Sequence, residues 1–197
     1  MNDIAFFDFD GTITNKDSTN EFFKFILNPW YFYFIKYIFT LPYLILYKIQ
    51  IIDSSQLKKK RYKYFLSKFN FIEIENYGNL FYYSKLNSLV KQSALDEIKW
   101  HKDKKNDIYI VSASLDVILN KWCEINEVAL ITNKLEFKNN KFTGNFLSPD
   151  CNGYEKVLRI KDKIILKNYN IVYAYGDTIK DIPMLNLATK KYYRYFK

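Results

Sequence analysis

Glycine, proline, cysteine and histidine are scarce in this chain of 197 residues, which has five Gly, four Pro, two Cys and one His. So few glycines and prolines, the residues that favour turns, argue against a loop-rich or disordered chain. Cys123 and Cys151 are too few for a disulfide framework or a four-ligand zinc site, and the lone His101 excludes a histidine-rich metal site. The start, MNDIAFFDFDGT, lacks a positively charged and apolar leader. We therefore expect no signal peptide and a cytoplasmic location.

Hydrophobic residues and positive charge are plentiful. Hydrophobic residues make up 49 % of the chain and aromatic residues 19 %, enough for the core of one domain that carries an insertion. The net charge of +9 favours anionic partners, either phosphorylated small molecules or an anionic membrane surface. Nucleic acid is not expected, because no recognised motif accompanies the charge. The densest basic run, at residues 58–63, is equally typical of a solvated helix face.

Strands and helices alternate at both ends of the sequence. Short apolar runs predict buried strands, at 4–7, 107–111, 128–132 and 171–175, with a last strand at 191–196. Helical patterns follow at 115–125, 154–167 and 179–187. A hairpin is predicted for 135–137 and 141–144 around Asn139-Asn140. This alternation predicts an α/β fold with a Rossmann-like, doubly wound parallel sheet.

A long helical insertion separates the first two strands. We assign 14–100 to an all-helical cap subdomain, and 1–13 with 101–197 to the α/β core. Asp17 or Ser18 caps a helix over 21–27, which Asn28-Pro29 closes. Further helices are expected at 54–67 and 72–90.

Residues 30–52 form the most apolar segment of the chain. Their length would suit a membrane span, but Lys36, Lys48 and Pro42 weaken that interpretation. We predict two shorter helices bent near Pro42, packed inside the cap. Contact of one face with a membrane surface stays open as an alternative.

Polar residues stand where three predicted strands end. Asp8, Ser112 and Asp177 follow separate strands, and ligands of open α/β sheets bind beyond the carboxyl ends of strands. Asp10 lies two residues after Asp8, and Asp181 lies one helical turn after Asp177. So many carboxylates in a basic chain indicate a metal site, and oxygen ligands favour Mg²⁺.

Two further features suit an anion beside this metal. Ser112 heads a VSAS turn before a predicted helix, whose first N–H groups form an anion cradle. Lys156 lies at the start of another predicted helix, where a cation is unfavourable unless it faces an anion. Gly11 permits a tight turn after the two carboxylates.

In order and separation, DFDGT, Ser112, Lys156 and GDTIKD resemble the four motifs of the haloacid dehalogenase superfamily. VSAS, GDTIKDIPML and the helical insertion are similar to its phosphoserine phosphatase-like branch. Thr178 and Lys180 depart from the residues common at those positions.

The resemblance implies a role for each residue. Asp8 would be the nucleophile that forms an aspartyl-phosphate, and Asp10 the general acid and base. Phosphate would be bound by Ser112, Lys156, Gly11 and Thr12. Mg²⁺ would be held by Asp8, the backbone carbonyl of Asp10 and Asp177, with Asp181 supporting. Asp17 and Arg61 are the cap residues that would contact substrate.

We therefore expect a Mg²⁺-dependent phosphatase acting on a small phosphorylated metabolite resembling phosphoserine. Lipid-phosphate hydrolysis at a membrane is the alternative, because segment 30–52 adjoins the basic run at 58–63. A non-catalytic phosphoryl-receiver module is a remote third, since receivers lack Asp10-Gly11-Thr12 in this form and lack such an insertion. The sequence leaves the oligomeric state open.

Overall fold

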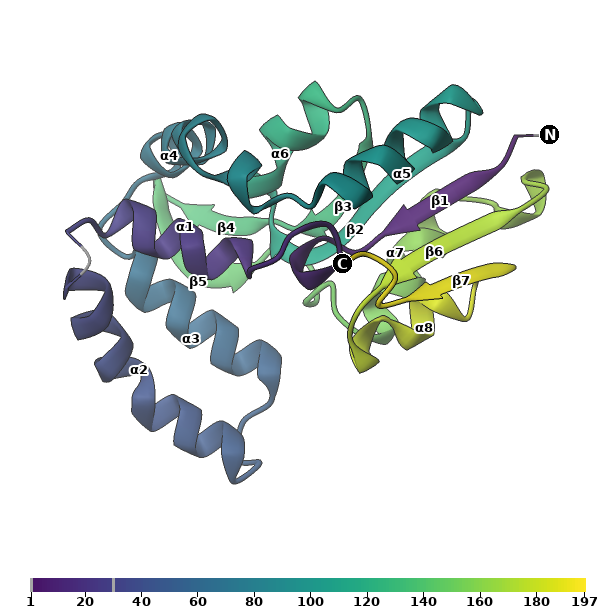
Figure 1. The fold of residues 1–197 in the computed structure, drawn as a ribbon. Coiled ribbons are helices and arrows are strands. Elements are labelled where there is room, and N and C mark those ends of the chain that lie inside the picture. Colours follow the sequence, from purple (N-terminus) through teal and green to yellow (C-terminus); the bar gives the residue numbers. More distant parts are fainter. Residues whose placement is uncertain (1, 30) are drawn as a thin grey trace.

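A five-stranded parallel sheet forms the centre of the molecule (Figure 1). The computed structural model describes residues 2–29 and 31–197. The strand order is β3-β2-β1-β6-β7. The strands are β1 (Ile4–Phe7), β2 (Asp107–Leu115), β3 (Ala129–Asn133), β6 (Val172–Gly176) and β7 (Lys190–Tyr193). An antiparallel hairpin, β4 (Leu135–Lys138) and β5 (Lys141–Phe146), lies outside the sheet.

The two faces of the sheet bury two separate cores. Alternate residues of β1 point to opposite faces, so Ile4 and Phe6 join one core while Ala5 and Phe7 join the other. Helices α5 (Gln92–Asp103) and α6 (Asp116–Ile125) cover the face of Phe7. Helices α7 (Tyr154–Lys163) and α8 (Ile182–Leu185) cover the face of Ile4. The predicted α/β, doubly wound parallel fold is confirmed.

Five helices are inserted between β1 and β2. They are α1 (Ser18–Ile26), α2 (Tyr31–Lys48), α3 (Ser54–Leu66), α4 (Phe71–Ser84) and α5. Helices α2 and α3 pack side by side, and α3 also contacts β5 (Figure 1). Helix α4 packs on α6, where a Cβ on Gly78 would lie 1.9 Å from the Val117 carbonyl oxygen. Helix α5 packs on β2, so the predicted cap boundary at residue 100 falls inside a helix that covers the sheet.

The prediction of two helices bent near Pro42 is wrong, because α2 runs unbroken from Tyr31 to Lys48. Proline deprives the Ile38 carbonyl of its helical partner. Both Pro42 and Ile38 are exposed, so water can satisfy that carbonyl without a break in the helix. Trp30, the first residue of the predicted segment, lies outside the described residues.

Other predicted helices are shorter in the structure. The helix expected over 72–90 is α4 followed by a 3₁₀ turn at Leu86–Leu89. The one expected over 154–167 ends at Lys163. The one expected over 179–187 is a 3₁₀ turn at Ile179–Asp181 leading into α8. The hairpin is confirmed, with Asn139 and Asn140 at positive φ as a tight two-residue turn requires.

Candidate active site

Asp8 follows the last residue of β1 and is buried at 6 % exposure. Its backbone N–H donates to the Tyr175 carbonyl of the neighbouring strand β6 at 2.9 Å, which fixes where the side chain emerges. The carboxylate accepts hydrogen bonds from Lys156 Nζ at 2.6 Å and from Thr12 Oγ1 at 3.1 Å. Burial raises the pKa of Asp8 to about 7 despite the neighbouring ammonium. The single ammonium of Lys156 therefore does not offset the cost of burying the charged carboxylate.

Lys156 is the third residue of α7, and its side chain is 2 % exposed. Its Nζ lies 2.6 Å from Asp8 Oδ1 and 2.6 Å from Asp181 Oδ1. Burial opposes the charged form, but the two carboxylates outweigh it and raise the pKa of Lys156. In the structure Lys156 therefore faces two carboxylates, and its contact with a bound phosphate stays a prediction.

Asp177 and Asp181 extend the acidic cluster from the end of β6. Thr178 holds Asp181 Oδ2 through its backbone N–H at 3.0 Å and its hydroxyl at 2.7 Å. Burial would raise the pKa of Asp181, but Lys156 and the Thr178 donors keep it below its ordinary value. Burial raises the pKa of the half-buried Asp177.

Three carboxylates come within reach of one metal ion. One oxygen each of Asp8, Asp177 and Asp181 lies within 4.8 Å of the others. Thr12 Oγ1 lies 3.1 Å from both Asp8 and Asp177 and joins them. One ammonium, that of Lys156, neutralises only part of this charge. The donor set and its excess negative charge fit a hard divalent cation such as Mg²⁺.

Gly11 has φ +85°, a conformation that L side chains rarely adopt. A Cβ there would also lie 2.4 Å from Asp177 Oδ2. Its carbonyl accepts a hydrogen bond from Lys91 Nζ at 2.7 Å, which anchors the loop Phe9–Ile13 to the segment before α5. Glycine is therefore required for the β1 loop to approach β6 this closely.

Asp10 points toward the junction of α1 and β2. The Ser18 N–H, at the first residue of α1, donates to Oδ1 at 2.7 Å, and the Ser114 hydroxyl of β2 donates to Oδ2. Burial, helped by repulsion from Asp17, raises the pKa of Asp10 to about 6. Asp10 can therefore both hold and release a proton near neutral pH.

The prediction that Ser112 heads a turn into a helix is wrong. Strand β2 continues to Leu115, and α6 begins only at Asp116. The register of β2 against β3 shifts between Val111 and Leu115. In this irregular stretch Ser112 Oγ accepts a hydrogen bond from the Ser114 N–H at 3.1 Å. The bulge, rather than a helix end, therefore positions both serines.

A cavity of about 210 Å³, here called the carboxylate cavity, collects most of the predicted residues. The predicted residues that line it are Asp8, Asp10, Asp17, Ser112, Lys156 and Asp181. Gly11, Thr12 and Asp177 do not line it, but line a separate small pocket of about 10 Å³. Arg61 does not line it, because its guanidinium turns toward Asn20, at 3.3 Å, and the Tyr37 ring.

Sequence reasoning missed several residues of the wall. They are Thr19, Lys58, Tyr62, Ser114, Asn152 and Lys180. Lys58 and Tyr62 are four residues apart and therefore share one face of α3. That spacing was readable in the sequence, but the direction of the face was not. Lys58 Nζ crosses to the core, where it lies 3.1 Å from Asp150 Oδ1 and 3.3 Å from the Ala113 carbonyl.

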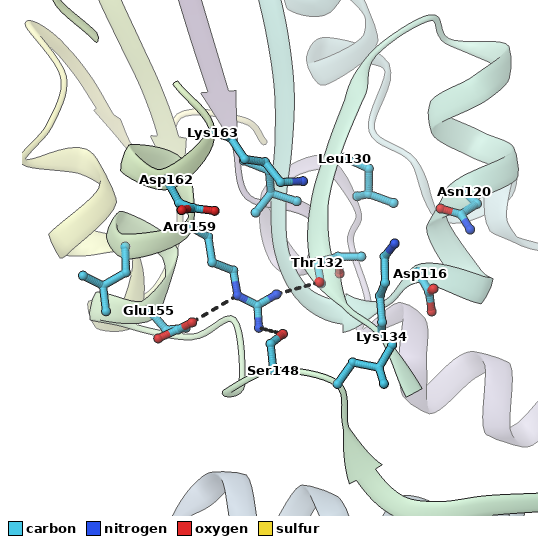
Figure 2. A pocket seen from close by; sticks show the side chains of 13 residues that line it. Asp116, Asn120, Leu130, Thr132, Lys134, Ser148, Glu155, Arg159, Asp162 and Lys163 are labelled. Atoms are coloured by element: carbon cyan, nitrogen blue, oxygen red, sulfur yellow. Dashed lines mark hydrogen bonds and ion pairs between the residues drawn. The ribbon is translucent and has the colours of Figure 1, made fainter. Parts of the chain in front are cut away.

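Two of the larger cavities extend beyond this cluster. The rim cavity, about 620 Å³, lies between the start of α3 and the core, and shares Asn152 and Lys180 with the carboxylate cavity. Figure 2 shows the other, about 590 Å³, beside β3, where Arg159 donates to the Thr132 carbonyl at 2.7 Å. Its wall includes none of the predicted site residues, so it is separate from the acidic cluster.

Comparison with known proteins agrees with this geometry. Residues 5–186 match the family model described as haloacid dehalogenase-like hydrolase. Protein CicA of Caulobacter vibrioides (strain NA1000 / CB15N) is 31 % identical over 197 residues, which cover 98 % of this chain and 86 % of that protein.

Two solved structures share the fold at low sequence identity. A protein of unknown function from Bordetella pertussis Tohama I superposes with a TM-score of 0.83 at 17 % identity, over 97 % of this chain and 89 % of that one. A phospho-aspartyl intermediate analogue of phosphoserine phosphatase superposes with a TM-score of 0.63 at 20 % identity, over 96 % and 85 %.

Proposed function

Because the chain belongs to the haloacid dehalogenase-like hydrolases, we propose that it hydrolyses phosphomonoesters through an aspartyl-phosphate on Asp8. One observation carries the proposal: the buried Asp8 carboxylate lies 2.6 Å from Lys156, beside an independently held Asp10. The phosphoserine phosphatase that shares this fold was solved as an analogue of a phospho-aspartyl intermediate, which supports the same chemistry here. A receiver module without turnover does not fit membership of a hydrolase family.

In the first step a carboxylate oxygen of Asp8 attacks phosphorus, and the bond from phosphorus to the leaving oxygen breaks. Lys156 and Ser112 would hold the phosphoryl oxygens, a role supported by their position in the wall of the cavity beside Asp8. Asp10, with its pKa near 6, gives its proton to the leaving oxygen.

In the second step Asp10 takes a proton from water, and the resulting hydroxide attacks phosphorus. The bond from phosphorus to Asp8 breaks, which restores the carboxylate and releases phosphate. Hydrogen bonds from Ser18 and Ser114 keep the Asp10 carboxylate in one orientation through both steps.

Mg²⁺ is the proposed cofactor. Asp8, Asp177 and the backbone carbonyl of Asp10 would hold it, with Asp181 supporting the site. The ion would neutralise charge on the transferring phosphoryl group. Asp181 also keeps Lys156 in place through their 2.6 Å ion pair.

We propose a small phosphorylated metabolite, resembling phosphoserine, as the substrate, and a cytoplasmic location. The carboxylate cavity, about 210 Å³, suits a phosphate with a short leaving group. A lipid phosphate is the second candidate. It is favoured by the rim cavity, which would accommodate a larger headgroup and adjoins the apolar helix α2 through the start of α3.

The test is Asp8→Asn, assayed with phosphoserine, sugar phosphates, nucleotides and lipid phosphates. The amide cannot act as the nucleophile, so turnover should fall by at least about 10³-fold while circular dichroism stays unchanged. The matched control is Asp103→Asn, an exposed carboxylate on α5, which should keep full activity. Wild-type protein should lose turnover in EDTA and regain it with Mg²⁺. Turnover retained in Asp8→Asn would contradict the nucleophile assignment.

A further inference from the structure

Helix α2 carries an apolar face that stays exposed among the described residues, 2–29 and 31–197. Its outer stripe comprises Ile35, Ile38, Phe39 and Ile45, with Ile49 and Ile51 in the turn that follows, and each is 47–65 % exposed. The helical members are spaced to share one face, whereas Tyr33 and Thr40 are buried on the opposite face. Soluble helices place polar residues at such outward positions, and large exposed apolar patches mark interaction surfaces.

The segment of the chain that carries the outer stripe is strongly basic. Between Phe22 and Ile72 the sequence has nine basic residues and one acidic residue, Asp53, so this segment carries +8 of the net +9. The ring of Phe39 lies 6.0 Å from that of Tyr64 on α3. Lys60, four residues before Tyr64, shares its face of α3 and is exposed beside the stripe.

The flanking lysines are available to an outside partner. Lys48, Lys60 and Lys68 are exposed, and none of them forms an ion pair within residues 2–29 and 31–197. An apolar strip bordered by unpaired lysines matches the two attractions of an anionic bilayer, acyl chains and negative headgroups.

Other occupants fit less well. A second copy would bring two segments of charge +8 together, and that repulsion opposes self-association. A membrane span finds no support, since no helix in the described part of the chain is long and apolar enough to cross a bilayer. In Figure 1, α2 lies at the outer edge of the molecule, with α3 beside it.

We propose that the outer stripe of α2 docks on the surface of an anionic lipid bilayer, with the flanking lysines against the headgroups. Ile51 lies two residues before Asp53, which lines the rim cavity together with Ser54 and Ser55. Docking therefore brings the rim cavity to the lipid surface. If Asp8 is the nucleophile, substrates on that surface gain access to it.

The experiment is flotation of the full chain with phosphatidylcholine vesicles, with and without phosphatidylglycerol as about one lipid in three. Wild-type protein should float with the anionic vesicles and not with the neutral ones. Ile38→Glu/Phe39→Glu should weaken binding by at least about tenfold, because it places charge in the apolar contact. Lys60→Glu/Lys68→Glu should weaken binding similarly and should make the binding that remains less sensitive to added salt.

Two control variants test whether binding depends on the outer stripe itself or on any exposed apolar residue or lysine. Ile165→Glu changes an exposed apolar residue of the α/β domain, far from the stripe in sequence, and should bind as wild type does. Lys99→Glu/Lys104→Glu changes two exposed lysines on and beside α5 and should also bind as wild type does. Circular dichroism and hydrolysis of a soluble aryl phosphate confirm that the stripe variant is folded. Binding with no hydrolysis would refute the proposed function and leave docking intact.

Three results would overturn the proposal. The first is wild-type protein that stays unbound with anionic vesicles. The second is a control variant, Ile165→Glu or Lys99→Glu/Lys104→Glu, that weakens binding as much as the stripe variants do. The third result is a dimer by light scattering that Ile38→Glu/Phe39→Glu dissolves, with no vesicle binding, which would assign the stripe to a second copy.

Discussion

Asp8 and Asp10 are two residues apart, yet their surroundings differ. Asp8 faces the Lys156 ammonium and the acidic cluster, and its pKa is raised to about 7. Asp10 accepts two hydrogen bonds at the cap junction, and its pKa is raised to about 6. Different environments for paired carboxyl groups are how enzymes separate the nucleophile from the proton carrier.

This division predicts how Asp10→Asn will behave. The variant cannot protonate the leaving oxygen, so kcat/KM for an alkyl phosphate should fall by about 10²–10⁴-fold. An aryl phosphate, whose leaving group needs little protonation, should lose much less in kcat/KM. Steady-state assays with both substrates measure the two losses, with Asp103→Asn as the control. Equal losses would contradict the role of proton donor.

Individual residues were predicted where chemistry alone identifies them. Asp8, Asp10 and Lys156 were readable because a buried strand end or a helix start seldom carries such charges without a partner. Lys58 and Tyr62 were not, because their position depends on how α3 lies over the sheet. Ser112 was placed in the cavity for the wrong reason, since a bulge in β2 has no clear signature in the sequence.

At the scale of elements, α4 and α6 approach each other closely at Gly78. Gly78 has no room for a Cβ, because the Val117 backbone carbonyl occupies that space. Backbone atoms cannot move aside as a flexible side chain can.

Gly78→Ala should therefore destabilise the protein, although alanine favours helix by about 1 kcal/mol. We expect a loss of about 2 kcal/mol in the free energy of unfolding, because α4 must move away from α6. Urea denaturation measures it. Asn79→Ala, the exposed neighbour on α4, also gains helix propensity, by somewhat less, without the clash, and should be neutral or slightly stabilising. A stabilised Gly78→Ala would contradict the close contact.

Strands were easier to predict than helices in this chain. Strands β1 and β6 are short apolar runs with both faces buried, as parallel sheets require. Helix α2 is apolar almost all round, so periodicity could not indicate which face packs on α3. Its continuity through Pro42 depends on the exposure of that turn, which only the packed structure sets.

At the scale of the whole molecule, a network of side-chain hydrogen bonds around the buried His101 joins α5 to the central sheet. The Asn106 amide donates to His101 Nδ1 at 2.8 Å, and His101 Nε2 donates to the Tyr175 hydroxyl at 3.0 Å. Tyr175 in turn donates to Glu97 at 2.6 Å. Burial lowers the pKa of His101 to about 4, so the folded protein holds this ring neutral.

A lowered histidine pKa makes folding sensitive to acid. The unfolded chain binds a proton at His101 below about pH 6.5, while the folded protein resists it, so stability falls as pH drops. Asp8 and Asp10, whose pKa values are raised, act in the opposite direction. The comparison is therefore wild type against His101→Gln. The free energy of unfolding of wild type, minus that of His101→Gln, should decrease by about 1–2 kcal/mol between about pH 7 and about pH 5. Parallel stability curves for the two proteins would contradict it.

The central position of β1 affects how the protein can be made. Residues 4–7 pair with 107–110 on one side and with 172–175 on the other. During synthesis the first strand must wait, unpaired, until two later segments have emerged from the ribosome. Such distant pairings slow folding and leave apolar surface exposed meanwhile. An unfinished chain that stops before Val172 therefore cannot assemble the surroundings of Asp8, and the nascent protein should remain inactive until late in its own translation.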